Sequence, residues 1–456
     1  MTTASMQIGG GAQSSHLHGP GSYSPDHARV SPGEIAIGVI IGRTSEFFDF
    51  FVYAIASVLV FPRFFFPYLS PTDGVLSSFA IFSLAFIARP IGTLVFTNID
   101  RMYGRSAKLA IALFILGGST ASMAFLPDFK TMGMGAVYLL ALFRLGQGFA
   151  LGGSWDGLAS LLALNAPVGR RGWYAMIPQL GAPLGLLTAS ALFAFFASAL
   201  SDADFLDWGW RFPFFVAFAI NVVALFARLR IVGTPEFAHL FETRDLQPEP
   251  VFQALRTEWR TIIIGAFAPL ASFALFHMVT VFPLSWVMLN TAERPVAFLT
   301  IESGAAIIGV MAIIMSGYLA DHLGRRKVLG YSAAAIAAFS GFAPQMLGMG
   351  PAGEMGFMII GFVVLGISFG QSSGAVAANF STRHRYTGSA LTSDIAWLVG
   401  AGFAPLVALE LAIHFGLIAS GAFLLSGAVA TLVALWVNHE LGAREAGSDA
   451  VIGGAL

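Results

Sequence analysis

Seven charged side chains fall inside stretches of the chain that are otherwise strongly apolar. They are Arg43, Glu46, Asp49, Arg89, Arg144, Asp156 and Asp394, and the titratable His277 has a similar position. A charge at the centre of a bilayer costs at least ~2.5–3.5 kcal/mol. Such residues are retained where they are paired, face water or carry out a function, so they are the candidate site.

Arg43, Glu46 and Asp49 follow one another at steps of three, which places them on one face of a helix. Two carboxylates this close repel each other, which favours proton uptake by one of them. We expect Glu46 or Asp49 to load and release a proton; the alternative is a static buried pair that only locks the first helix to the fourth. Arg43 fits two roles: a guanidinium fork for an anionic substrate, or the neutralising partner of Glu46, which is favoured.

The remaining candidates have weaker patterns. His277 lies in the middle of an apolar stretch and is a candidate proton relay, although an inert, hydrogen-bonded histidine is an equally good interpretation. Asp156 fits a pair with Arg170 or Arg171 at the membrane surface. Further side chains that offer polar or stacking contacts to a substrate, with plain packing as the alternative, are Gln179, Gln371 and Trp397.

The composition decides in which solvent these residues lie. Of 456 residues, 56% are hydrophobic and 11% are charged, whereas soluble domains carry about 25% charged residues. Such a chain cannot cover itself with polar groups, so lipid is part of its solvent. The formal net charge of −1 gives no hint of nucleic acid, and the absence of cysteine excludes disulfides and zinc–thiolate sites.

Twelve apolar segments approach the length of about 20 residues that a membrane-spanning helix needs. They cover 33–61, 75–97, 109–126, 136–163, 172–199, 210–230, 261–289, 296–319, 328–347, 354–379, 388–414 and 417–438. The sequence therefore predicts an all-α polytopic membrane protein of twelve helices. A polar linker, 231–260, separates two six-helix halves, 33–230 and 261–438, and residues 1–32 and 439–456 are expected to be cytoplasmic tails, the first of them disordered.

Basic residues favour one orientation. With the N-terminus inside, the inner loops and tails carry seventeen Lys and Arg residues and the outer loops carry four, which predicts that both termini are cytoplasmic. The two halves also repeat a short basic turn: DRMYGRSAK at 100–108 and DHLGRRK at 321–327. Internal repeats of this kind are typical of secondary transporters, whose site lies between the repeats.

Eight fragments resemble the major facilitator superfamily and, within it, the metabolite:proton symporter branch, which carries citrate, α-ketoglutarate, shikimate, proline or betaine. The resemblance covers about residues 33–437. The fragments are EFFDFFVY (46–53), RPIG (89–92), RLGQGFALGGSW (144–155), GRRGWY with PQLGAPLG (169–185), WGWRFPFF (208–215), RLRIVGTPEF (228–237), LADHLGRRK (319–327) and TRHRYTG (382–388).

Three positions depart from that family pattern. Arg101 stands where the first basic turn normally has an aspartate, and the acid is one place earlier, at Asp100. Ser154 replaces the usual acid of the fourth helix, and Asp156 is a candidate for the displaced acid. Arg43 is not the small residue expected in the first helix.

The resemblance implies which helices meet. Helices one and four line the central cavity, which implies a pair between Asp49 and Arg144, with Arg144 modulating the acid. Helices two and eleven meet between the halves, which implies that Arg89 and Asp394 close the cytoplasmic side; a permanent bridge is the alternative. The same resemblance implies gate and interface residues in the basic turns: Asp100, Arg105, Asp321, Gly324 and Arg325.

The sequence thus predicts a proton-coupled symporter for a small organic anion or zwitterion, working by alternating access as a monomer in the bacterial inner membrane. We expect no cofactor beyond the coupling proton, and no nucleic-acid partner. Nucleotide-binding, metalloprotease and serine-hydrolase motifs are absent, which argues against an enzyme. A uniporter, a drug–proton antiporter and a non-transporting sensor remain alternatives, the last because of Arg101 and Ser154.

Overall fold

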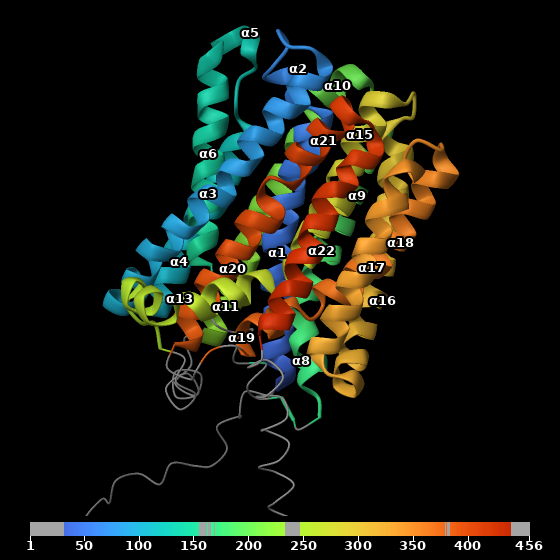
Figure 1. Ribbon diagram of the computed structural model, residues 1–456. Helices are drawn as coiled ribbons and strands as arrows, with labels where there is room; N and C mark the ends of the chain where they lie inside the picture. Colours follow the sequence, from blue (N-terminus) through green and yellow to red (C-terminus); the bar gives the residue numbers. More distant parts are fainter. Residues whose placement is uncertain are drawn as a thin grey trace, which may run out of the picture.

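The computed structural model describes residues 32–154, 162, 166–167, 169–232, 247–378, 380 and 384–438. These residues form helices joined by short turns and contain no strand. The helices run side by side in one elongated bundle (Figure 1). The predicted all-α fold class is confirmed.

The first half of the bundle, which we call the N-half, comprises residues 32–232. Its long elements are α1 (Pro32–Leu59), α3 (Pro71–Tyr103), α4 (Arg105–Ala124), α6 (Met134–Gly153), the continuous run α8–η1–α9 (Arg171–Met176, Ile177–Leu180, Gly181–Ala199) and α11 (Phe212–Val232). Three short helices cover its turns at one end: α2 (Phe61–Phe64), α5 (Phe129–Met132) and α10 (Asp202–Asp207).

The C-half comprises residues 247–438. Its elements are α13 (Val251–Phe267), α14 (Leu270–Thr280), α15 (Phe282–Asn290), α16 (Pro295–Leu323), α17 (Arg325–Met346), α18 (Pro351–Phe369), α19 (Ser372–Ala378), α20 (Arg385–Ala396), the π-helical turn η3 (Trp397–Gly402), α21 (Ala404–Phe415) and α22 (Ser420–Val437).

Within the described residues, ten helical stretches are long and apolar enough to cross a membrane. Two further helices complete twelve passes. α1 misses that criterion because Arg43, Glu46 and Asp49 interrupt its apolar run, and α17 because it begins with Arg325-Arg326-Lys327 and contains many small residues. The predicted number of passes is therefore present, and the two exceptions are explained by their charges and small side chains.

The seventh pass differs from the single segment predicted at 261–289. Helix α13 already begins at Val251, inside the predicted linker, and the pass is broken into α13, α14 and α15. Pro269 precedes α14 and Pro283 lies in the first turn of α15. Proline removes a helical hydrogen bond and clashes with the preceding turn, which accounts for the breaks.

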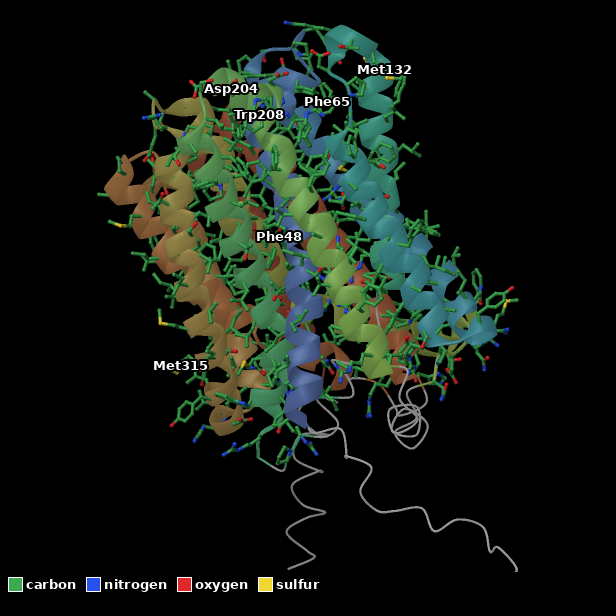
Figure 2. All side chains as sticks on the ribbon, turned by 180° about the vertical axis from the view of Figure 1, so that it is seen from behind. Phe48, Phe65, Met132, Asp204, Trp208 and Met315 are labelled. Carbon is green, nitrogen blue, oxygen red and sulfur yellow. The ribbon has the colours of Figure 1, made fainter. Side chains whose placement is uncertain are left out.

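The repeated basic turns take the same conformation in both halves. Gly104 ends α3 and precedes α4 with φ 82°, and Gly324 ends α16 and precedes α17 with φ 85°. Only glycine adopts this left-handed region without strain. We call the end of the bundle with these turns the basic end, and the opposite end, which carries Met132, Asp204 and Trp208, the far end (Figure 2).

Large apolar side chains cover the outside of the bundle. Phe114, Phe226 and Trp436 are 79%, 68% and 75% exposed. Exposed apolar surface on this scale marks contact with something other than water, and lipid tails fit a twelve-helix bundle.

The two halves meet along two seams. In one, α9 of the N-half packs along α16 of the C-half; in the other, α3 packs against α20, η3 and α21. The candidate site lies between these seams.

Candidate functional site

A pocket lies between the two halves, and we call it the central cavity. The N-half contributes Arg43 and Gln179 to its wall. The C-half contributes Phe273, Phe369, Ser372, Ser373, Val376, Ser393 and Trp397. One guanidinium, one amide and three hydroxyls thus share a small space with aromatic rings, a combination typical of small-molecule sites.

Aromatic rings from both halves pack on the far-end side of this cavity. The ring of Phe276 lies 4.9 Å from that of Phe369 and 5.2 Å from that of Trp397, between ring centroids. Phe47 of α1 reaches the same rings, with its centroid 6.0 Å from Trp397. These contacts close the cavity toward the far end.

Arg43 lies on the cavity wall and pairs with Glu46. Its Nη1 is 2.8 Å from Glu46 Oε2, and Arg228 Nη2 is 2.8 Å from Glu46 Oε1. The contact expected between Arg43 and Glu46 is present. The second arginine, Arg228, was not among the candidate residues; it lies buried on α11.

The expected pair of Asp49 and Arg144 is not a direct contact, because Gln147 lies between them. Arg144 Nη1 donates to Gln147 Oε1 at 3.0 Å, and Gln147 Nε2 donates to Asp49 Oδ2 at 3.4 Å. Gln147 follows Arg144 by nearly one turn of α6, so its amide reaches the space where a direct contact was expected. No ion pair joins Asp49 to Arg144 in the described structure.

The charge of Arg144 is held by aromatic rings and a carbonyl. Its guanidinium lies 4.0 Å from the centroid of Tyr53 and 4.7 Å from that of Phe82, and its Nε donates to the Phe82 carbonyl at 3.1 Å. Cation–π contacts of this kind stabilise a desolvated cation. Asp49 is 2% exposed, and its Oδ1 has no hydrogen-bond partner among the described residues.

His277 is enclosed by rings and does not line the central cavity. Its Nδ1 lies 2.6 Å from the Ala401 carbonyl and its ring stacks on Phe50, with centroids 5.1 Å apart. Pro405, four residues on, has no N–H to donate to this carbonyl, which also accepts from the backbone N–H of Phe403. This geometry favours the inert, hydrogen-bonded interpretation of His277.

Arg89 and Asp394 form the predicted contact between the halves. Arg89 Nε is 2.8 Å from Asp394 Oδ1, and the Thr93 hydroxyl donates to the other carboxylate oxygen. The guanidinium also lies 6.0 Å from the ring centroid of Trp397. The bridge therefore adjoins the cavity wall.

At the basic end, Asp100 takes part in a second contact between the halves. Lys108 Nζ lies 2.8 Å from Asp100 Oδ2, and the Tyr386 hydroxyl of α20 donates to the same oxygen at 2.9 Å. Arg105 lies over the Tyr386 ring at 5.3 Å. Lys108 and Tyr386 were not among the candidates, since a basic loop residue and a tyrosine carried no distinguishing signal.

Asp321 and Arg325 form the matching contact of the second repeat. Asp321 Oδ1 accepts from the backbone N–H of Gly172 at 2.6 Å and of Trp173 at 3.3 Å. Arg325 Nη1 donates to the Gly374 carbonyl at 3.0 Å and its Nη2 to the Arg171 carbonyl at 3.5 Å. Both residues join the start of α8 to the C-half at the basic end.

The predicted cavity residues divide into wall and interface. Gln179 and Trp397 line the wall, and Gln179 donates to the Ser372 hydroxyl at 3.2 Å. Gln371 does not line the wall: its Nε2 donates to the Gly172 carbonyl at 3.2 Å, so it belongs to the contacts at the basic end. Asp156 lies outside the described residues.

The sequence reasoning missed a buried acid on α16. Glu302 is fully buried, and its Oε2 accepts from the Ser190 hydroxyl of α9 at 2.8 Å. A lone acid within an apolar segment was the available signal.

Comparison with known proteins agrees with this architecture. The sequence profile of the family described as "Sugar (and other) transporter" matches residues 35–262. The inner membrane metabolite transport protein YhjE of Escherichia coli K12 is 36% identical over 427 residues, covering 92% of this chain and 96% of that protein. The chain belongs to the major facilitator superfamily.

Other relatives within this superfamily have named substrates. The shikimate transporter of Escherichia coli K12 is 30% identical over 407 residues, covering 86% of this chain and 92% of that protein. The proline/betaine transporter of the same organism is 29% identical over 385 residues, covering 81% and 75%. The metabolite transporter branch is therefore shown, and the chain is a membrane transporter rather than an enzyme.

Solved structures of the superfamily share the fold. The proton:xylose symporter XylE, bound to 6-bromo-6-deoxy-D-glucose, aligns with a TM-score of 0.69 and 16% identity, covering 89% of this chain and 95% of that one. The partially occluded, inward-open conformation of XylE from E. coli aligns with a TM-score of 0.68.

Proposed function

We propose that this transporter is a proton-coupled symporter that carries a small organic anion or zwitterion by alternating access. The observation that carries the proposal is the central cavity, in which Arg43 provides a cation between the two halves. The halves rock about this cavity, so that it opens to one side of the membrane at a time.

The substrate class follows from how Arg43 is held. Glu46 is shared by Arg43 and Arg228, so a substrate carboxylate can bind Arg43 while Arg228 still neutralises Glu46. Guanidinium forks bind carboxylates strongly, and the hydroxyls of Ser372, Ser373 and Ser393 offer further hydrogen bonds. The named relatives, which carry shikimate or proline and betaine, have substrates of this size.

The proton site is best supported at Asp49. Glu46, the other candidate, already has two arginine partners, whereas Asp49 is buried and reaches Arg144 only through Gln147. A buried carboxylate without a direct cation favours its neutral form. Arg144 modulates Asp49 through Gln147, and His277 packs against the rings of Phe50 and Phe82.

The contacts at the basic end form the inner gate in this proposal. Arg89–Asp394, Asp100–Tyr386 and the contacts of Asp321 and Arg325, with Gly324 as their turn, separate when the cavity opens inward. The basic end faces the cytoplasm, according to the distribution of Lys and Arg, and the bundle acts as a monomer in the bacterial inner membrane. No cofactor takes part besides the proton.

Uptake into proteoliposomes tests this proposal. Labelled citrate, α-ketoglutarate, shikimate, benzoate-type acids and betaine are offered with an inward proton gradient and after its collapse by an uncoupler. We expect accumulation of an acid or zwitterion that needs the gradient, is lost in Asp49→Asn, and loses apparent affinity in Arg43→Gln.

Each other outcome identifies an alternative. Equilibration that ignores the gradient and survives Asp49→Asn indicates a uniporter, and outward movement driven by the gradient indicates an antiporter. Ligand binding without counterflow indicates a sensor. Glu46→Gln is the matched control for Asp49→Asn, since it removes a carboxylate one turn away, and we expect it to retain gradient dependence.

A further inference from the structure

The acid on α16 lies in the seam between the halves. Glu302 and Ser190 are both fully buried, and the Ser190 hydroxyl donates to Glu302 Oε2 at 2.8 Å. The second carboxyl oxygen, Oε1, is buried without a hydrogen-bond partner in the described structure. The single polar partner of Glu302 therefore comes from the opposite half.

Among the described residues, no cation faces this carboxyl from the elements packed against α16. In α9 and α15 every residue is uncharged, and the charged residue of α18 is Glu354, which interacts with Glu293. The charged and titratable groups of α8, α17 and α16 itself lie toward the basic end: Arg171, Tyr174, Tyr318, Asp321, His322, Arg325, Arg326, Lys327 and Tyr331. Asp321 is 19 residues further along α16, or about 28 Å at the rise of an α-helix.

A carboxylate buried without a cation is strongly disfavoured, so a closed seam holds Glu302 in its neutral form. Ser190 moves away with the N-half when the far end opens, and water then replaces it around the carboxyl. The carboxyl ionises in water at neutral pH. Closing the seam again requires a proton to bind to Glu302.

We propose that Glu302 is a proton-binding site, separate from Asp49, whose protonation is required for the far end of the transporter to close. On closure one proton from the solution at the far end bonds to a Glu302 oxygen; on opening the O–H bond breaks and the proton returns to water. The proposal rests on the alternating access of the proposed function, and it adds a second proton to the cycle.

Distance measurements between spin labels test this directly. The chain contains no cysteine, so Met132→Cys and Met349→Cys introduce two unique labelling sites. Both positions are exposed, one on the N-half and one on the C-half. Met132 ends α5 at the far end (Figure 2), and Met349 lies in the turn between α17 and α18. The distances are measured by double electron–electron resonance in nanodiscs across a pH series, with no substrate and no gradient.

In the protein labelled at positions 132 and 349, we expect a lower pH to increase the population with the short label-to-label distance, which is the closed far end. Glu302→Gln, which keeps the shape and removes the charge, should hold the short distance at every pH, and Glu302→Asp should restore a pH response. Glu354→Gln is the matched control: it neutralises another buried glutamate of the C-half away from the seam, and the response should remain.

A response in Glu302→Gln equal to that of the parent overturns the proposal, and so does a parent without any response. The Asp49→Asn variant separates the two proton sites. A response retained in Asp49→Asn supports a separate site, even where the uptake assay fails to show symport. A response lost in Asp49→Asn and retained in Glu302→Gln assigns the titration to Asp49 and overturns the proposal.

Discussion

The two ends of the seam between the halves are closed by different chemistry. At the basic end, the contacts between the halves include the ion pair Arg89–Asp394. Asp321 also accepts hydrogen bonds there from two backbone N–H groups of the N-half. Toward the far end, the polar contacts between the halves in the described structure are Ser190–Glu302 and the donation of Ser83 to the Gly402 carbonyl. Charge holds the basic end, whereas apolar packing and a buried acid without a cation partner in the described structure hold the far end.

The difference implies different ways of opening. Separating the basic end breaks charge-assisted hydrogen bonds. Water molecules or a bound anion can then take the place of the lost partners. Separating the far end exposes Glu302, which ionises on opening in our proposal, so that proton concentration would act on that end in particular. Four substitutions or conditions test this comparison, in order of expected effect.

The largest effect should follow from Arg89→Ala, because it leaves Asp394 buried without its cation. Breaking a buried ion pair from one side costs roughly 3–5 kcal/mol, so the closed state of the basic end should be strongly depopulated. Spin labels at the exposed positions Tyr103 and Leu323 measure the separation. The double variant Arg89→Gln with Asp394→Asn removes both charges and should be milder; an equal or larger effect in the double variant contradicts the expectation.

A smaller effect should follow from Asp321→Asn. The substitution weakens the hydrogen bonds from Gly172 and Trp173, and hydrogen bonds to a charged group contribute about 1.5–3 kcal/mol. The same basic-end labels should report opening, while the labels at Met132 and Met349 should report closure of the far end. Movement of both ends in the same direction would argue against rocking of rigid halves.

Ser190→Ala should have a modest effect confined to the far end. It removes a neutral hydrogen bond, for which about 0.5–1.5 kcal/mol is typical. Ser198→Ala is the matched control, because Ser198 is exposed on the same helix and its hydroxyl donates to the Phe195 carbonyl of its own half. Equal far-end distances in the two variants would show that Ser190 contributes nothing to closure.

The smallest effect concerns a surface acid near one label. The pKa of Asp128 is held below its usual value because the hydroxyl and the backbone N–H of Thr131 donate hydrogen bonds to its carboxylate. The stabilisation is present above the ordinary pKa and is lost as pH falls through the lowered one. Mild acid should therefore leave α5 intact, and hydrogen exchange of the Thr131 amide measures this. If the Thr131 amide lost its protection already in mild acid, the pH-dependent change in the Met132–Met349 distance would come from the Asp128 cap of α5 and not from Glu302.

Much of the fold followed from local sequence properties. The twelve passes and the repeated basic turns are visible as apolar runs and as glycines beside charged residues. The seventh pass differed because Pro269 and Pro283 break a segment that is apolar throughout. Apolar length alone does not distinguish a straight helix from three short ones.

The site was predicted less completely. The contact of Arg89 with Asp394 was expected from the resemblance and is present, and the step from Arg43 to Glu46 is a local property of one helix. The intervention of Gln147 between Asp49 and Arg144, and the place of Gln371 in the interface, were not expected. Both depend on which side chain fills a shared space, and residue type does not specify that.

The sequence by itself determined the membrane environment, the helix count and the positions of the charges along the helices, because composition and helical spacing are local. The tertiary structure alone decided which of those charges have partners. Glu46 finds Arg228 across 182 residues, and Glu302 finds Ser190 across 112. Such pairs form only when helices distant in sequence lie side by side, and that neighbourhood decides whether a buried acid is held as an ion or as a neutral group.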